Sequence, residues 1–158
     1  EEMKVEYINP FITAAQSMVK TLCAVDAKLG KVFLKKSPYA VDQVIILIGV
    51  VGEIKGQVCF ELSVETAKKI ASIMMGGVPV MELDEISKSA VAELGNMIMG
   101  NAATIFESKN IGIDITPPSL LMGERIEISN EFPTISIPLE LEGLGKLFIN
   151  VNAEEVIK

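Results

Sequence analysis

A regularly spaced set of small and polar side chains interrupts the otherwise apolar stretch at residues 86–118. At about 100° per residue of a helix, Ser89, Glu93, Asn96 and Gly100 fall on one narrow stripe along its surface. The chain contains no histidine, so chemistry on this stripe must come from carboxylates, amides and hydroxyls, or from a group that a partner brings. Glu93 and Asn96 lie one turn apart and suit a helix face that reaches into the cleft of another protein.

The opposite side of the same helix is apolar and decides how the stripe is presented. Val91, Leu94, Ile98 and Ile105 fall on that side, which predicts that it packs on the core and leaves the stripe in solvent. A Glu and an Asn three residues apart also occur in many ordinary solvated helices. Spacing alone therefore does not distinguish a catalytic stripe from an ordinary solvent-exposed helix face.

The elements that must position this stripe are predicted from capping residues and breakers. Three helices are expected, each preceded by a residue that can accept hydrogen bonds from the first free backbone N–H groups. They are predicted over residues 9–25, with Asn9 as N-cap and Pro10 at the first helical position, from Ser63 to the paired glycines 76–77, and from Asp84 to about Lys109.

Runs of Val, Ile and Phe mark the strands that should support these helices. "QVIILIGVVG" and "KGQVCFELS" are expected to form a hairpin whose turn lies near Gly52 to Gly56. Residues 31–37 are expected to form an edge strand.

The segment "TISIPLELE" alternates apolar and polar residues as a half-buried antiparallel strand does. Its Pro138 indicates an edge strand or a bulge, because proline cannot donate to the ladder. Together the elements predict a single α+β domain spanning residues 1–158, in which long helices pack on one face of an antiparallel or mixed sheet.

Composition narrows the possible functions. A net charge of −7 and a pI near 4.7 argue against nucleic acid and anionic membranes as partners, because both need clustered cations. Only the lysine pairs 35–36 and 68–69 are doubled, and both are interpreted as solvated. The absence of histidine excludes Ser-His-Asp and Cys-His catalysis and most zinc sites, so no metal site is expected.

The two cysteines and the chain start bear on location. Cys23 and Cys59 sit in apolar surroundings far apart in the sequence, as buried reduced thiols do. The first residues lack the pattern of a secretory signal. A cytoplasmic protein is therefore expected.

The segments around the stripe resemble the CheC/CheX family of chemotaxis phosphatases, and its CheX members most closely. The family signature is Asp or Ser, three residues, Glu, two residues and Asn, which Ser89, Glu93 and Asn96 match. "ASIMMGG" before the long helix, "ELGNM" within it and "DITPP" after it follow the order of the family. CheC proteins usually carry a second copy of the signature; residues 9–25 contain none, which favours a single-site, CheX-like protein.

The resemblance implies hydrolysis of the aspartyl phosphate on a CheY-type response regulator, in chemotaxis or another two-component pathway. Asn96 would hold the attacking water, and Glu93 would pair with a lysine of the regulator. Ser89 would contact the partner or be merely a small helix residue, and Gly100 would permit close approach of the partner's backbone. The family further implies no cofactor of its own, Mg2+ on the regulator, and a homodimer formed through sheet edges.

A non-catalytic role is the main alternative. The middle domains of flagellar motor switch proteins resemble this fold and act as scaffolds, and a domain that only binds a regulator would also keep the stripe. Both Glu93 and Asn96 are present, which favours the phosphatase, because a scaffold has no need of the pair.

Overall fold

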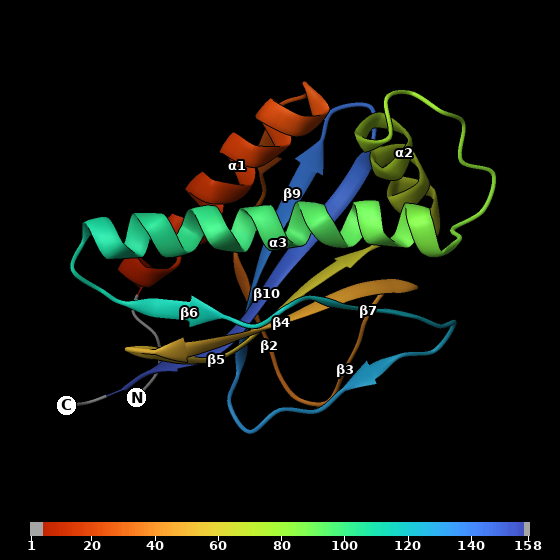
Figure 1. The fold of residues 1–158 in the computed structure, drawn as a ribbon. Coiled ribbons are helices and arrows are strands. Elements are labelled where there is room, and N and C mark those ends of the chain that lie inside the picture. The colour runs from red at the N-terminus through yellow and green to blue at the C-terminus, as the bar shows by residue number, and fades with distance from the viewer. Residues whose placement is uncertain (1–4, 157–158) are drawn as a thin grey trace.

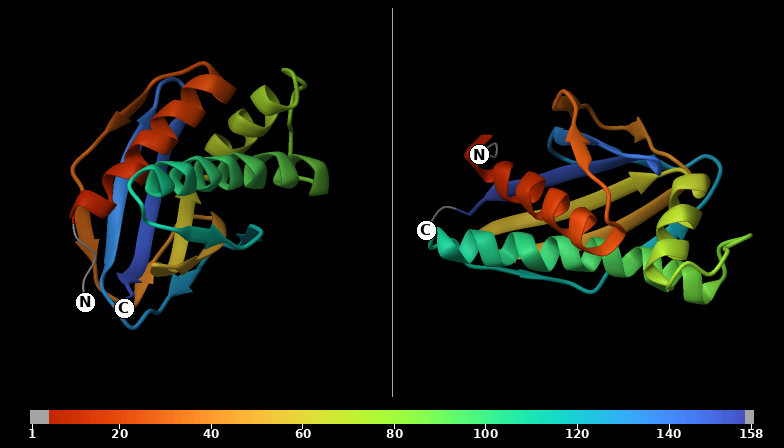
Figure 2. Two further views of the ribbon diagram at one scale, coloured as in Figure 1. Left: turned by 60° about the vertical axis from the view of Figure 1, so that its left-hand side comes forward. Right: turned by 90° about the horizontal axis from the view of Figure 1, so that it is seen from above.

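An antiparallel sheet forms the centre of the computed structural model, which describes residues 5–156. Eight strands of these residues follow the order β1-β9-β10-β5-β4-β6, with β2 also pairing with β9 and β7 with β4, while β3 and β8 pair separately. The α-helices of the described chain cover one face of this sheet (Figures 1 and 2). The expected α+β architecture is therefore confirmed. The elements are η1 Val5–Tyr7, α1 Asn9–Cys23, β1 Ala27–Leu29, β2 Phe33–Lys35, β3 Tyr39–Ala40, β4 Val44–Gly52, β5 Ile54–Leu62, α2 Val64–Met74, α3 Glu85–Ser108, β6 Ile113–Ile115, β7 Ser119–Met122, β8 Glu127–Ile128, β9 Thr134–Leu141 and β10 Gly145–Glu155.

The starts of α2 and α3 follow the capping residues predicted from the sequence. The Ser63 hydroxyl accepts a hydrogen bond from the Thr66 backbone N–H at 3.1 Å. At α3, the Asp84 carboxylate accepts from the Ser87 N–H, and the Ser87 hydroxyl accepts from the Asp84 N–H, both at 2.8 Å. This reciprocal capping box satisfies backbone donors at the helix start, and its hydrogen bonds lower the pKa of Asp84.

The start of α1 differs from the prediction. Asn9 is already helical, and the N-cap is Ile8, whose side chain makes no capping hydrogen bond. Pro10 lies in the first turn, where its missing N–H removes no helical hydrogen bond. The helix ends at Cys23, two residues earlier than predicted, because Ala24 adopts a left-handed conformation with φ of 58°.

The core fills the space between the helices and the sheet. Strands β4 and β5 form the predicted hairpin with a single residue between them. Alternate β4 residues point toward the helices, and Phe106 of α3 meets Phe11 of α1 edge-on at 5.4 Å. The inward residues of β4 are at most 2% exposed and are Val44, Ile46, Ile48 and Val50.

Strand β9 is internal, so the expectation that Pro138 marks an edge strand is wrong, whereas the alternative, a bulge, is confirmed on the neighbouring strand: residues 30–32 lie opposite residues 137–138, one residue more than the register of β9 requires. The pairing of β9 with β10 runs through Pro138 without a register change. Its outer neighbour is split instead, because β1 pairs with residues 139–141 and β2 with residues 134–136. Gly30 N–H donates to the Pro138 carbonyl at 2.8 Å. The missing N–H of Pro138 therefore lies opposite Gly30, an exposed residue at the break between β1 and β2, where the Gly30 carbonyl can be solvated instead.

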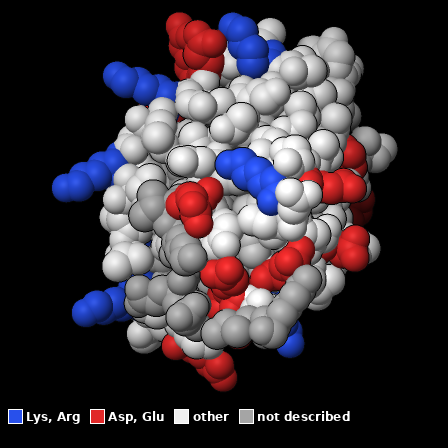
Figure 3. All heavy atoms as spheres, turned by 90° about the vertical axis from the view of Figure 1, so that its left-hand side faces the viewer, with Lys and Arg blue, Asp and Glu red and all other residues white. Residues whose placement is uncertain are grey.

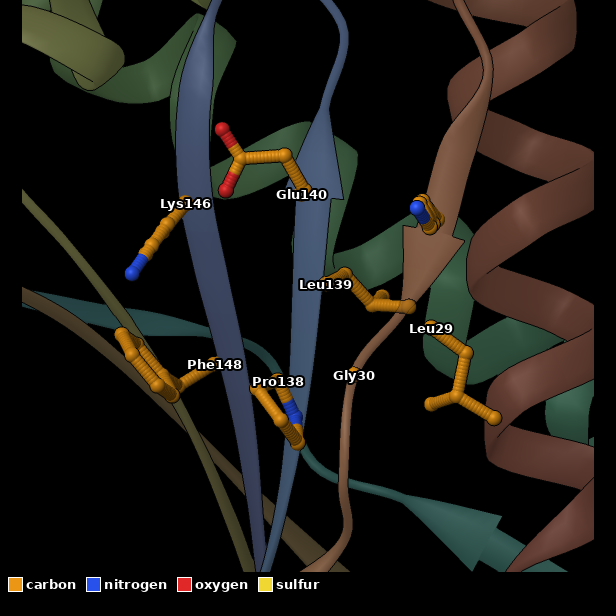
Figure 4. Close-up of a pocket in the computed structure, with 8 residues that line it drawn as sticks. Leu29, Gly30, Pro138, Leu139, Glu140, Lys146 and Phe148 are labelled. Atoms are coloured by element: carbon orange, nitrogen blue, oxygen red, sulfur yellow. The ribbon is translucent and has the colours of Figure 1, made fainter.

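This break opens a hollow of about 250 Å³ on the helix-free side of the sheet. Figure 4 shows Leu29, Gly30, Pro138 and Phe148 around it, with residues from β1, β9 and β10 forming its walls. None of its lining residues belongs to α3. The hollow is therefore separate from the predicted stripe.

A polar cluster is buried on this same side, beneath the segment that contains β2. Lys35 Nζ lies 2.9 Å from Glu61 Oε2, which also accepts from Asn150 Nδ2 at 2.8 Å. Ser136 Oγ donates to Asn150 Oδ1 at 2.7 Å. The interpretation of Lys35 as a solvated lysine is wrong: its side chain is 14% exposed. The rings under its ammonium group, 5.0–5.9 Å away, are Phe33, Tyr39 and Phe148.

The cysteines match the expectation from their apolar surroundings. Cys23 and Cys59 are both buried and free. Burial raises the pKa of both thiols, that of Cys59 to about 12, so they stay protonated and inert near neutral pH. Among the described residues, no helix combines the length and the apolarity needed to cross a membrane.

Candidate active site

The predicted stripe lies on α3, which is held firmly on the body of the protein. Figure 1 shows the helix crossing the whole front of the molecule. One side of it is buried against the sheet, α1 and α2, which confirms the predicted core side except that Ile105 is only half-buried. The residues that anchor this side are at most 3% exposed and include Val91, Leu94, Ile98, Met99, Ala102 and Phe106.

The stripe residues lie on the outer side of this anchored helix. Ser89 and Glu93 are exposed, whereas Asn96 and Gly100 are half-buried. The helix runs without a break from Glu85 to Ser108. At about 1.5 Å per residue, the stripe is about 16 Å long, and Glu93 and Asn96 are separated by about 5 Å along the axis. The structure therefore brings all four predicted residues onto one surface.

The side chains of Glu93 and Asn96 do not contribute polar interactions to the fold of the described residues. Within residues 5–156, neither the Glu93 carboxylate nor the Asn96 amide makes a hydrogen bond or ion pair. An Asn in a helix interior lowers helix propensity slightly, so neither residue is explained by the stability of the fold. Both side chains are available to bind groups on another molecule.

A metal site of its own is not found on the part of the chain that is described. No group of three or more Cys, Asp or Glu side chains there could hold an ion. The chemistry that Glu93 and Asn96 can supply is thus a negative charge, and an amide that both donates and accepts hydrogen bonds without titrating. An amide of this kind can orient a water molecule on a reactive group that the partner supplies.

Two glycines of α3 differ in what surrounds them. A Cβ added at Gly95 would lie 3.3 Å from Ile46 Cγ2, so Gly95 allows the helix to approach β4 closely. A Cβ added at Gly100 would meet no atom within 4 Å. The fold of the free protein therefore does not explain why position 100 has no side chain.

Sequence reasoning missed one residue of the stripe. Ile86 is three residues before Ser89 and seven before Glu93, which places it on the same side of α3. Its side chain is 68% exposed. Its spacing from Ser89 and Glu93 is the signal in the sequence, but an apolar side chain does not stand out in a search for polar residues.

The two ends of α3 differ in the charged residues around them. Figure 3 views the end of the molecule where α3 finishes, and its acidic side chains gather in the lower half of that face. Tyr7 at this end donates to Glu155 Oε1 at 3.0 Å; this hydrogen bond, burial and the nearby charges of Glu155, Glu6 and Glu53 raise its pKa. The first turn of α3 offers little net charge, because Lys88 pairs with Glu85 at 3.3 Å.

Comparison with known proteins identifies the family. The model for chemotaxis phosphatase CheX matches residues 44–140, more than half of the chain and all of α3. The chain belongs to the CheX family. It is 30% identical over 139 residues to the CheY-P phosphatase CheX of Thermotoga maritima, covering 88% of this chain and 90% of that protein.

Solved structures of the CheX family share the whole fold. A CheX–CheY–BeF3–Mg2+ complex from Borrelia burgdorferi contains a chain that is 30% identical, with a TM-score of 0.80 and coverage of 96% of this chain and 100% of that one. The FliM middle domain from H. pylori is more distant, at 14% identity, a TM-score of 0.63 and coverage of 98% and 94%. That likeness extends to the fold alone.

The equivalent spacing on α1 carries different residues. Thr13, Ser17 and Lys20 repeat the separations of Ser89, Glu93 and Asn96 and are all exposed. They include no carboxylate and no amide. α1 thus lacks a second copy of the CheX-family signature.

Proposed function

We propose that this protein hydrolyses the aspartyl phosphate of a CheY-type response regulator. Membership of the CheX family supports this activity, as do the phosphatase named in Thermotoga maritima and the complex with CheY from Borrelia burgdorferi. The observation that carries the proposal is the pair formed by the exposed Glu93 and the half-buried Asn96 on the outer side of one continuous helix, neither of them with a partner among the described residues.

In the proposed reaction, a water molecule attacks the phosphorus, and the bond between phosphorus and the aspartyl oxygen breaks. Inorganic phosphate leaves, the carboxylate of the regulator is restored, and a proton from the water passes to solvent or to the phosphate. Phosphoryl transfer depends mainly on positioning the nucleophile and stabilising charge. The Asn96 amide would hold the water in line. Mg2+ on the regulator, an ion that the complex with CheY contains, would stabilise the phosphoryl oxygens.

Glu93 would fix the docked complex by pairing with a lysine of the regulator. Its exposed position one turn before Asn96 allows both side chains to enter the same cleft. Ser89 would lie at the edge of this contact. Gly100 would let the regulator's backbone approach the helix, as expected for a position where a side chain would otherwise stand in the way.

The proposal is tested by following phosphate loss from a phosphorylated CheY-type regulator, with this protein present in sub-stoichiometric amounts. We expect many regulators to be dephosphorylated by each molecule. If decay is unchanged while the regulator still binds, the non-catalytic binding domain replaces the phosphatase as the better proposal.

Gly100→Ala should affect binding of the partner and stability of the fold in opposite directions. The added methyl group meets nothing in the free protein, so the higher helix propensity of alanine should stabilise it by about 0.5–1 kcal/mol. In the complex the same methyl group would hold the regulator away. We expect catalytic efficiency to fall at least tenfold while the free energy of unfolding in urea rises.

Gly95→Ala is the matched control, because it lies on the buried side of the same helix. Crowding against Ile46 should offset its gain in helix propensity, and its activity should stay close to that of the parent. Equal activity of the Gly100→Ala variant and the parent would contradict the proposed close approach.

We further propose that residues 1–158 act as one cytoplasmic domain and form a homodimer through a sheet edge. Exposed apolar side chains on β2, Phe33 and Leu34, support the edge formed by β1 and β2. That edge is at the opposite end of the strand order from β6 and β7, which contact α3, so a dimer there leaves the stripe free. Light scattering that gives the mass of one chain would contradict the dimer.

A further inference from the structure

The most exposed large apolar side chains cluster at the start of α3. Among the large apolar residues of the described chain, Met81 at 85% and Ile86 at 68% are the most exposed, and Val78 is 53% exposed. A single exposed apolar residue is ordinary, but a group of them beside a site marks an interaction surface. We call Val78, Met81 and Ile86 the entry patch.

The entry patch is continuous with the stripe. Ile86 lies two turns before Glu93 on the same side of α3, at an axial distance of about 10 Å. A standard protein–protein interface buries about 800 Å² on each partner, which corresponds to a disc with a radius of about 16 Å. Ile86 is about 15 Å from Asn96 along the axis, so a regulator that places its phosphorylated aspartate at Asn96 reaches Ile86 at the rim of the interface.

The segment that carries the rest of the patch is held in place and loops outward from α2 and α3 (Figure 1). Leu83 is buried and Val80 is half-buried against the core, so these two side chains anchor the segment. Val78 lies before the first anchor and Met81 lies between the two, and both are exposed. Gly77 N–H bonds to the Ser72 carbonyl at 2.8 Å, which fixes its first end.

Electrostatic attraction is poorly suited to hold a regulator at this end of α3. The protein carries a net charge of −7, which gives no long-range attraction to an acidic partner. The Lys88 ammonium group is already paired with Glu85. Other charges lie nearby, with Glu82 and Asp84 exposed before the helix and Lys68 and Lys69 lining a hollow with Met81. Apolar area is the contribution to affinity at this end that does not depend on charge.

We propose that the entry patch binds an apolar surface of the same response regulator, at the rim of the contact around its phosphorylated aspartate, and adds to the affinity. This inference rests on the proposed function. The occupant is a folded regulator domain whose surface beside the phosphorylation site carries aliphatic or aromatic side chains. The patch selects among regulators by that surface, while Glu93 and Asn96 act on groups that phosphorylated regulators of this type share.

The test uses Ile86→Ser, Met81→Ser and the double variant in the phosphatase assay with a phosphorylated CheY-type regulator. Serine and isoleucine have similar helix propensities. The side chains of Met81 and Ile86 do not belong to the core, so the thermal stability of the variants should not change. We expect the double variant to raise KM about tenfold with kcat unchanged, a difference of about 1.4 kcal/mol. The increase should persist at high salt, because it does not arise from charge.

Val51→Ser is the matched control, since Val51 is 45% exposed at the end of β4 and alternates with the residues of that strand that face the helices. An unchanged KM in the double variant would overturn the inference, while the proposed function would still stand if Asn96→Ala abolishes turnover. If the parent shows no turnover, calorimetry with the regulator bound to BeF3 and Mg2+ decides instead: an equal Kd for parent and double variant also overturns it. Loss of self-association in the double variant would assign the patch to a second copy of this chain and overturn it too.

Discussion

Asn96→Ala is expected to abolish the acceleration of phosphate loss from the regulator while leaving the fold intact. The Asn96 amide makes no hydrogen bond within the described residues, so its removal leaves no internal group unpaired. Loss of one group that positions a reactant or stabilises the transition state costs about 10²–10³ in kcat, or about 3–4 kcal/mol. Single-turnover measurements of the phosphorylated regulator in the presence of excess protein would report the chemical step directly.

Asn101→Ala provides the matched control on the same helix. Asn101 is half-buried and lies off the stripe, so its replacement should leave kcat within a small factor of the parent. Glu93→Ala should differ from Asn96→Ala by weakening binding of the regulator as well as lowering the rate. A parental rate in Asn96→Ala would refute the water-positioning role, whatever the binding data show.

Lys35→Ala is expected to lower the free energy of unfolding by about 3–5 kcal/mol, because it leaves a buried carboxylate without its partner. Glu61 is 7% exposed and accepts hydrogen bonds from Lys35, Asn150 and the Asp42 backbone N–H. Two of these three bonds would remain, but the charge would be uncompensated. Urea unfolding at constant pH measures the loss.

The ion pair between Lys88 and Glu85 serves as the control for this prediction. It has a similar geometry at 3.3 Å, but the Glu85 side chain is 93% exposed, so Lys88→Ala should change stability by no more than about 0.5 kcal/mol. Adding Glu61→Gln to Lys35→Ala should recover part of the loss, because it removes the charge and keeps an acceptor for Asn150 or the Asp42 N–H. If Lys35→Ala and Lys88→Ala lower the free energy of unfolding equally, burial of the Lys35–Glu61 pair is not the cause of the loss.

Features set by neighbouring residues were predictable from the sequence. The caps of α2 and α3, the β4–β5 hairpin and the stripe on α3 all depend on residues within a few positions of one another. The signature Ser89, Glu93 and Asn96 belongs to this group, because a helix converts spacing directly into direction. The sequence therefore predicted the position of the stripe on α3 better than it predicted the sheet, while the roles of these residues stay predictions.

Features set by distant residues were missed. Lys35 seemed solvated because its partner, Glu61, lies 26 positions away on another strand. Pro138 indicated an edge, but its missing donor is tolerated inside the sheet because β1 and β2 separate beside it. No local pattern encodes either arrangement. Asn9 is an error of another kind, in which a local signal was present but was not used. Asn9 was the predicted N-cap, but α1 begins at Asn9 itself, with Ile8 as the N-cap.

The placement of Glu93 and Asn96 on the outside of a helix has a consequence for substrate choice. A hydrolase that encloses its substrate can recognise a small phosphorylated metabolite by surrounding it. A projecting helix surrounds nothing, so under the proposed function the walls, the cation and the leaving group all come from the phosphorylated protein. Free acyl phosphates of low molecular weight should then be ignored, and the regulator's own fold, rather than a pocket in this protein, would determine which phosphoryl groups are removed.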